Sequence, residues 1–182
     1  MFMQINTWDK ACGLALKEIF DYAKTIRLED PLGLTELDAV SHALAEFVRH
    51  PHDADIFQAA ALMRHAAACA LHIMHESSHI LTQETMQPLL CRKQHDYGHG
   101  NIENFGLVGV AVRLCDKIAR AKNLKKRGGN VVKNETIVDT YEDIVGYATI
   151  AIMLRDGTFS LDLDTNETAK RKYITTESEN TK

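Results

Sequence analysis

Residues 54–81 read ADIFQAAALMRHAAACALHIMHESSHIL, and this stretch decides the expected fold. Only Asp55, Arg64 and Glu76 carry a formal charge in it, so a helix formed here would be apolar on most of its sides. Such a helix lies either at the centre of a bundle or in an interface between subunits. The stretch therefore predicts a helical bundle in which this segment is covered by other helices.

The segments on both sides also show helical patterns. Apolar residues recur at helical spacing from about residue 7 to 25. A turn at Pro31 and Gly33 precedes a helix that Thr35 is expected to cap and that Pro51 ends. Further helices are expected at about 88–93, 107–124 and 135–155. No segment has a convincing strand pattern, so the predicted fold class is all-α.

The length of 182 residues suits one well-packed domain with a modest extension. We expect an N-terminal helical region over 1–85, a core over 86–158 and a polar flexible tail over 159–182. The long apolar helix implies apolar surface on a single chain, so a homo-oligomer is also expected.

The charge balance argues against several classes of partner. The chain has 21 Lys and Arg against 25 Asp and Glu, a net charge of −4, so it offers no global basic field for direct nucleic-acid binding. Its 4 cysteines form no CxxC pair, which is typical of a reduced, cytoplasmic protein. Charged side chains interrupt the most apolar stretches, so no membrane span is expected.

Four carboxylates share one face of the helix expected over 135–155. Glu135, Asp139, Glu142 and Asp143 fall within an arc of roughly 100° on a helical projection. Clustered carboxylates of this kind suit a hard divalent cation such as Mg²⁺ or Mn²⁺, which often shares its ligands with substrate phosphates. The alternative is a solvent-exposed face whose first acidic residues favour the positive end of the helix dipole.

The preceding helix carries a mainly basic stripe. Arg113, Asp116, Lys117, Arg120 and Asn123 lie within roughly 120° of arc. Basic side chains beside an acidic stripe suit a phosphate held over a metal ion. Ordinary salt bridges between two antiparallel helices would give the same pattern.

The stretch CRKQHDYGHGN, residues 91–101, lies between two apolar segments. By itself it reads as a polar turn in which Asp96 and Gly98 are ordinary turn residues. If Lys93 and Asp96 approach the two stripes in space, however, this stretch with Tyr97 forms one wall of a nucleotide pocket. The stretch thus has both a structural and a functional interpretation.

The three motifs together resemble a phage-associated family, nucleotide modification associated domain 1. Its pattern is K-x-x-D-Y-G, then R-x-x-D-K-x-x-R-x-x-N-L, then E-[ST]-h-x-D-T with a later Asp and Tyr. The matching positions are Lys93, Asp96, Tyr97, Gly98, Arg113, Asp116, Lys117, Arg120, Asn123, Leu124, Glu135, Asp139, Thr140, Asp143 and Tyr147. More distantly, the chain resembles the MazG-like all-α nucleoside triphosphate pyrophosphohydrolases.

The resemblance implies a Mg²⁺-dependent pyrophosphohydrolase acting on a (deoxy)nucleoside triphosphate, in the host cytoplasm if the chain is phage-encoded. The implied metal ligands and catalytic residues are Asp116, Glu135, Asp139 and Asp143. The implied substrate-binding residues are Lys93, Asp96, Tyr97, Arg113, Lys117, Arg120 and Asn123. The MazG-like signature E-E-x-x-E is absent, because Lys117 and Arg120 stand where acidic residues would be expected. A non-catalytic protein that binds or sequesters a nucleotide is therefore an alternative.

A second motif lies in the apolar stretch. His75, Glu76 and His79 form HESSH, which satisfies the zinc-hydrolase pattern H-E-x-x-H. On a helix the two histidines would share a face and bind zinc, with the glutamate as general base. The alternative is a polar seam of histidines inside the bundle or at an interface. A zinc-dependent hydrolase is thus a third candidate.

Overall fold

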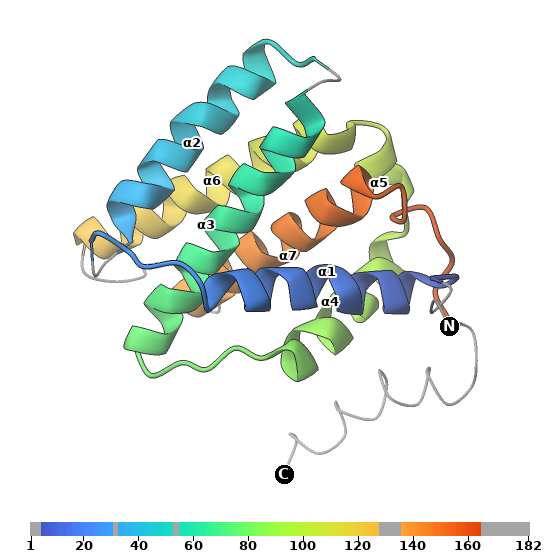
Figure 1. The fold of residues 1–182 in the computed structure, drawn as a ribbon, viewed down its shortest axis with the longest axis horizontal. Coiled ribbons are helices and arrows are strands. Elements are labelled where there is room, and N and C mark those ends of the chain that lie inside the picture. Colours follow the sequence, from blue (N-terminus) through green and yellow to red (C-terminus); the bar gives the residue numbers. More distant parts are fainter. Residues whose placement is uncertain (1–4, 31–32, 53–54, 128–135, 165–182) are drawn as a thin grey trace.

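The computed structural model describes residues 5–30, 33–52, 55–127 and 136–164. These residues form seven helices and no strand, which confirms the all-α prediction. The helices are α1 (Trp8–Ala23), α2 (Leu34–Arg49), α3 (Ile56–Glu76), α4 (Gln83–Tyr97), α5 (Gly100–Glu103), α6 (Gly106–Arg127) and α7 (Ile137–Arg155). Figure 1 shows α3 crossing the middle of the bundle, with α1 and α4 on one side and α2 and α6 on the other.

The apolar helix α3 lies at the centre of the bundle. It packs most extensively against α7 and also contacts α1, α2 and α6. Its buried residues occur on several sides and include many alanines, whose small side chains allow neighbouring helix axes to approach closely. In length and hydropathy α3 passes as a membrane span, the one such helix within the described ranges, but more than half of that stretch is buried inside the protein. Its position within a single chain accounts for its apolar composition.

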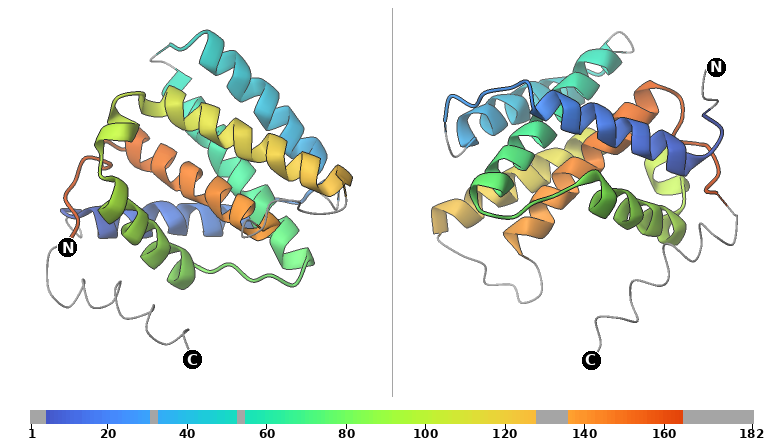
Figure 2. Two further views of the ribbon diagram at one scale, coloured as in Figure 1. Left: turned by 180° about the vertical axis from the view of Figure 1, so that it is seen from behind. Right: turned by 60° about the horizontal axis from the view of Figure 1, so that its bottom comes forward.

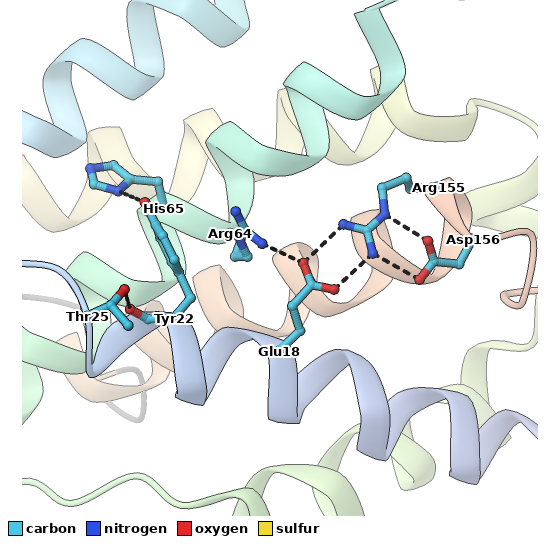
Figure 3. Close-up of polar contacts among 7 residues, drawn as sticks. All are labelled: Glu18, Tyr22, Thr25, Arg64, His65, Arg155 and Asp156. Carbon is cyan, nitrogen blue, oxygen red and sulfur yellow. Dashed lines mark hydrogen bonds and ion pairs between the residues drawn. The ribbon is translucent and has the colours of Figure 1, made fainter. Parts of the chain in front are cut away.

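Three helices are joined by one carboxylate. Glu18 of α1 accepts hydrogen bonds from Arg64 of α3 at 2.8 Å and from Arg155 of α7 at 2.9 and 3.0 Å (Figure 3). The Arg64 guanidinium also lies over the ring of Tyr22, 4.3 Å from its centroid. These polar contacts fix α1 across α3 and α7 at the edge of the apolar core.

Helix α4 begins earlier and ends later than the sequence pattern indicates. The predicted helix ran from Pro88 to near Lys93, but α4 extends from Gln83 to Tyr97 with Pro88 inside it. A capping box explains the early start, because Thr82 and Thr85 each bond the backbone N–H of the other through their hydroxyl groups. The later end places the whole Lys93–Tyr97 stretch on one helix.

The segment after α7 folds back onto the start of α1. Phe159 is buried, and its ring meets the rings of Trp8 and His99 edge to face. The backbone N–H of Trp8 donates to the carbonyl of Asp162 at 2.8 Å. Residues 159–164, which the sequence pattern assigned to the flexible tail, are therefore packed, while 165–182 lie outside the described residues.

Candidate functional site

A cavity of about 310 Å³ opens where α4, α5, α6 and α7 meet the start of α1. Figure 2 shows the arrangement from behind, with α6 beside α7 and with α4 and α5 at one end of the pair. Of the residues predicted to form the site, Lys93, Tyr97, Arg113 and Asp143 line this cavity. Part of each of the three motifs therefore converges in space.

The approach of α4 to α7 depends on a glycine. Gly146 of α7 lines the cavity, and a Cβ atom on it would lie 3.0 Å from Cδ2 of Leu90 in α4. A side chain at position 146 would press on the end of the Leu90 side chain, which would have to shift to make room. The close contact brings Lys93, one turn after Leu90, within reach of Asp143, one turn before Gly146.

Asp143 is held by two lysines. One of its carboxylate oxygens accepts from Lys93 Nζ at 2.7 Å, and the other contacts Lys117 Nζ of α6 at 2.9 Å. Burial works to raise the pKa of Asp143, but the bonds from both lysines outweigh it and hold the pKa below its usual value. Burial likewise works to lower the pKa of Lys117, and the bond to Asp143 outweighs it, so this pKa is raised. Asp143 and Lys117 are therefore both charged at neutral pH.

The mouth of the cavity combines a cation with an exposed ring. Arg113 of α6 donates to Oδ1 of Asn101 in α5 at 3.0 Å, which orients its guanidinium along the cavity wall. Tyr97 is 75% exposed although it lines the cavity, so the face of its ring is open to a ligand. Gly98, with φ of 63°, ends α4 and turns the chain into α5, so that Asn101 reaches the cavity.

Other residues predicted for the site lie elsewhere. Asp116 and Asn123 are exposed on α6, and Asp96 is exposed at the end of α4, where its carboxylate faces His95; none of them lines the cavity. Lys117 and Arg120 do not line it either: Lys117 reaches Asp143 at the cavity wall, and the charge of Arg120 acts on Lys117. The basic stripe is thus only partly directed at the cavity.

The acidic stripe of α7 divides into different roles. Asp139 closes the capping box of α7, because its carboxylate accepts from the backbone N–H of Thr136 at 2.6 Å. Glu135 lies outside the described residues. Burial raises the pKa of Glu142, and the negative charges of Asp139 and Asp143 raise it further, against the opposing charge of Lys93.

These carboxylates do not form a metal site from the described protein groups alone. Nowhere in the described ranges are three His, Cys, Asp or Glu side chains placed to hold one ion. Asp139 is engaged by its own helix end, and Asp143 is engaged by two ammonium groups. The described part of the predicted four-carboxylate set therefore does not form a metal centre by itself, and the Mg²⁺ or Mn²⁺ ion stays a prediction.

The HESSH motif does not lie on one helix. α3 ends at Glu76, and Ser78 has a φ of 62°, so the chain has left the helix before His79. His79 Nδ1 instead lies 2.9 Å from the carbonyl oxygen of Ser77. His72, His75 and His79 line one open hollow of about 280 Å³ between the ends of α1 and α3. The shared helical face that the zinc interpretation requires is absent from this described segment.

Several residues of the cavity carried no functional signal in the sequence. Trp8, Gln94 and Asn101 line it. Trp8 belongs to the region with no recognised motif, and Gln94 occupies a variable position of K-x-x-D-Y-G. Only the fold brings α1 to the wall formed by α4 and α7.

Comparison with known proteins supports part of the sequence-based interpretation. No curated protein sequence and no solved structure matches the chain. Residues 93–154, about a third of the chain, match the family model of nucleotide modification associated domain 1. The matched segment contains Lys93, Tyr97, Arg113 and Asp143, the predicted residues that the fold gathers at the cavity.

Proposed function

We propose that the cavity binds a nucleoside phosphate, with its phosphate groups at Lys93, Lys117 and Arg113. The observation that carries the proposal is Asp143 at the cavity wall, paired with Lys93, which lines the cavity, and with Lys117, which reaches it from α6; Arg113 lines the same cavity. Lys93, Lys117 and Arg113 thus lie at or next to the cavity with one carboxylate, Asp143, in its lining, in a chain whose net charge is −4. Such a local excess of positive charge suits a small anion and not a polyanion.

The size and lining of the cavity fit the same ligand class. A volume of about 310 Å³ lies at the lower end of the range for small-molecule sites, which suits a mononucleotide and not a polymer. Phosphate oxygens would compete with Asp143 for the ammonium groups, and Arg113 offers a planar fork for two oxygens. The match to nucleotide modification associated domain 1 supports a role in nucleotide metabolism or modification, and such a role is expected in the cytoplasm.

The test is binding of nucleoside triphosphates and inorganic triphosphate to the purified chain, measured by calorimetry without a divalent metal. Lys117→Met should weaken binding about tenfold or more, because a charge-assisted hydrogen bond is lost. The matched control is Lys122→Met, since Lys122 lies on the same helix but pairs with Asp38 of α2. Equal binding by Lys117→Met and wild type would contradict the proposal.

Asp143→Asn separates two roles of the carboxylate. If Asp143 only holds the lysines, its neutralisation frees them, and metal-free binding of triphosphate stays equal or becomes tighter. If Asp143 instead serves as a ligand to a metal that bridges it to phosphate, the variant loses the part of the affinity that added Mg²⁺ provides. Both outcomes are read from one titration series with and without the metal.

Hydrolysis of a nucleoside triphosphate is the second candidate, in line with the more distant resemblance to MazG-like enzymes. The observation that favours it is Glu142, a half-buried carboxyl beside Asp143 whose raised pKa makes it a better proton acceptor. In this reaction water attacks the α-phosphorus, its proton passes to Glu142, and the bond to the leaving pyrophosphate breaks.

Release of pyrophosphate in the presence of Mg²⁺ or Mn²⁺ tests this second candidate. Glu142→Gln should abolish release and leave nucleotide binding in place, whereas Glu84→Gln, an exposed change on α4, should not affect either. Absence of release by the wild type with every nucleotide would leave binding without catalysis as the function.

A further inference from the structure

Two hydrogen-bond donors at the cavity have no partner in the free protein. Nε1 of Trp8 and Nε2 of Gln94 are shielded from water and make no hydrogen bond among the described residues. Both residues line the cavity, and they are only 1% and 7% exposed. Buried polar atoms of folded proteins are nearly always paired, so two orphaned donors at one cavity require an explanation.

The surroundings of Gln94 show what would satisfy it. Gln94 directly follows Lys93 and precedes Tyr97 by three residues, so its amide and the Tyr97 ring lie on adjacent parts of one helical face. An amide offers one acceptor and two donors side by side, and every nucleobase presents a donor next to an acceptor on its edge. An exposed aromatic ring is the usual platform on which a base stacks.

The alternative roles for the amide are poorly supported. Gln83 and Gln87, on the same helix, each donate to a backbone carbonyl of α1 at 2.9 and 2.8 Å and so join the two helices. Nε2 of Gln94 makes no such bond to any described residue, so this donor does not tie α4 to a described neighbour. Its terminal torsion is soft, so the amide can rotate to meet a ligand in the cavity that it lines.

We propose that Gln94 reads the nucleobase, so that the ligand of this cavity is a nucleotide recognised through its base and not polyphosphate alone. This inference rests on the proposed function and adds the part of the ligand that lies beyond the phosphates. Trp8 supplies a second donor at the same wall. Tyr97 supplies the stacking surface.

The experiment compares wild type, Gln94→Met and Gln87→Met with two ligands, a nucleoside triphosphate and inorganic triphosphate. The four common bases are screened first, and the tightest nucleotide is used. We expect wild type to bind that nucleotide at least tenfold more tightly than inorganic triphosphate. Gln94→Met should lose about 10- to 100-fold in nucleotide affinity and nothing in triphosphate affinity.

The folding of the variants supplies an independent readout. Methionine keeps the length of glutamine without its polar atoms, so Gln94→Met should melt at the same temperature as wild type or higher, because an unpaired buried donor is removed. Gln87→Met should melt lower, because it breaks a bond to α1, and should keep the base preference. A lower melting temperature for Gln94→Met would show a structural role and overturn the proposal.

The remaining outcomes separate this inference from the proposed function. If inorganic triphosphate binds wild type as tightly as every nucleotide, the cavity recognises phosphate alone, and only the inference about Gln94 is wrong. Equal losses for both ligands in Gln94→Met would also overturn it. If neither ligand binds wild type, the proposed function fails and this inference fails with it.

Discussion

Asp143 joins two lysines from different helices, and its carboxylate is largely shielded from water. Because its pKa is lowered in the folded state, these ion pairs stabilise the fold above the unfolded pKa of about 3.9, and their contribution is lost as the pH falls through the lower folded value. We expect Asp143→Asn to lower the free energy of unfolding by about 1–2 kcal/mol at pH 7.

Urea unfolding at a series of pH values measures this difference. The deficit of Asp143→Asn should shrink as the pH falls from about 4 through the lower folded pKa, because the wild-type carboxyl becomes neutral over that range. Asp21→Asn is the control, since Asp21 pairs with Lys17 and Lys24 at an exposed position of α1. A deficit that stays constant with pH would show that the charge of Asp143 is not its cause.

The sequence could identify those site residues whose chemistry is evident without the fold. Lys93, Arg113 and Asp143 carry charges in motifs of fixed spacing, and they do line the cavity. Asp139 belongs to the same acidic stripe, yet its carboxylate caps α7, because a carboxylate at the third helical position suits a cap as well as a ligand. Gln94 carries neither charge nor motif position, so its place at the cavity required the fold.

The start of α2 illustrates how an element depends on one backbone conformation. Gly33 precedes α2 with a φ of 59°, and a Cβ atom on it would meet Cδ1 of Ile73 at 3.0 Å. We expect Gly33→Ala to lower the free energy of unfolding by about 2–3 kcal/mol, through backbone strain and displacement of Ile73. The matched control is Gly157→Ala, which has a φ of 66° and open space around it.

Thermal and chemical unfolding of both alanine variants check this expectation. Gly157→Ala should cost only the backbone strain of about 1 kcal/mol. Similar losses for the two variants would mean that the contact with Ile73 adds nothing.

The polar junction of α1, α3 and α7 supports a further prediction. Removing Glu18 leaves Arg64 and Arg155 without their shared carboxylate, and all three side chains are largely shielded. Glu18→Ala should therefore lower the free energy of unfolding by about 2 kcal/mol at neutral pH. The pKa of Glu18 is lowered, chiefly by the hydrogen bond from Arg155, so in wild type this stabilisation disappears as the pH falls through the folded value.

Measurement of unfolding at pH 7 and at pH 3 checks the role of Glu18. An unchanged stability of Glu18→Ala at pH 7 would show that the junction contributes nothing to holding the three helices together.

Helices were easier to predict from the sequence than their ends. The apolar stretch at 54–81 indicated a covered helix, and α3 is the centre of the bundle. The predicted C-terminal end of this helix was wrong. Apolar residues continue past Glu76, but the helix ends there. α4 was predicted too short, since Pro88 was expected at its start, whereas the capping box at Thr82 starts the helix earlier and leaves Pro88 inside it.

The whole molecule has one core that combines both halves of the chain. The matched segment, 93–154, contains nearly all of α7. The most extensive packing of α7 is against α3, and α3 lies outside that segment. A fragment of residues 86–158 would expose this apolar face. We expect it to lack a cooperative unfolding transition, as followed by circular dichroism, while the full chain shows one.

A sharp transition in that fragment would show that residues 1–85 are a separate addition and not part of the core. The homo-oligomer stays a prediction at this scale, because the apolar helix that suggested it is covered within one chain. Sedimentation of the full chain measures the state directly.

The placement of Trp8 gives the molecule a built-in optical reporter. It is the only tryptophan among the 182 residues, so nearly all intrinsic emission excited at long ultraviolet wavelengths comes from one indole ring. That ring is buried, lines the cavity and touches Phe159. Occupation of the cavity should therefore shift or quench the emission of the unlabelled protein.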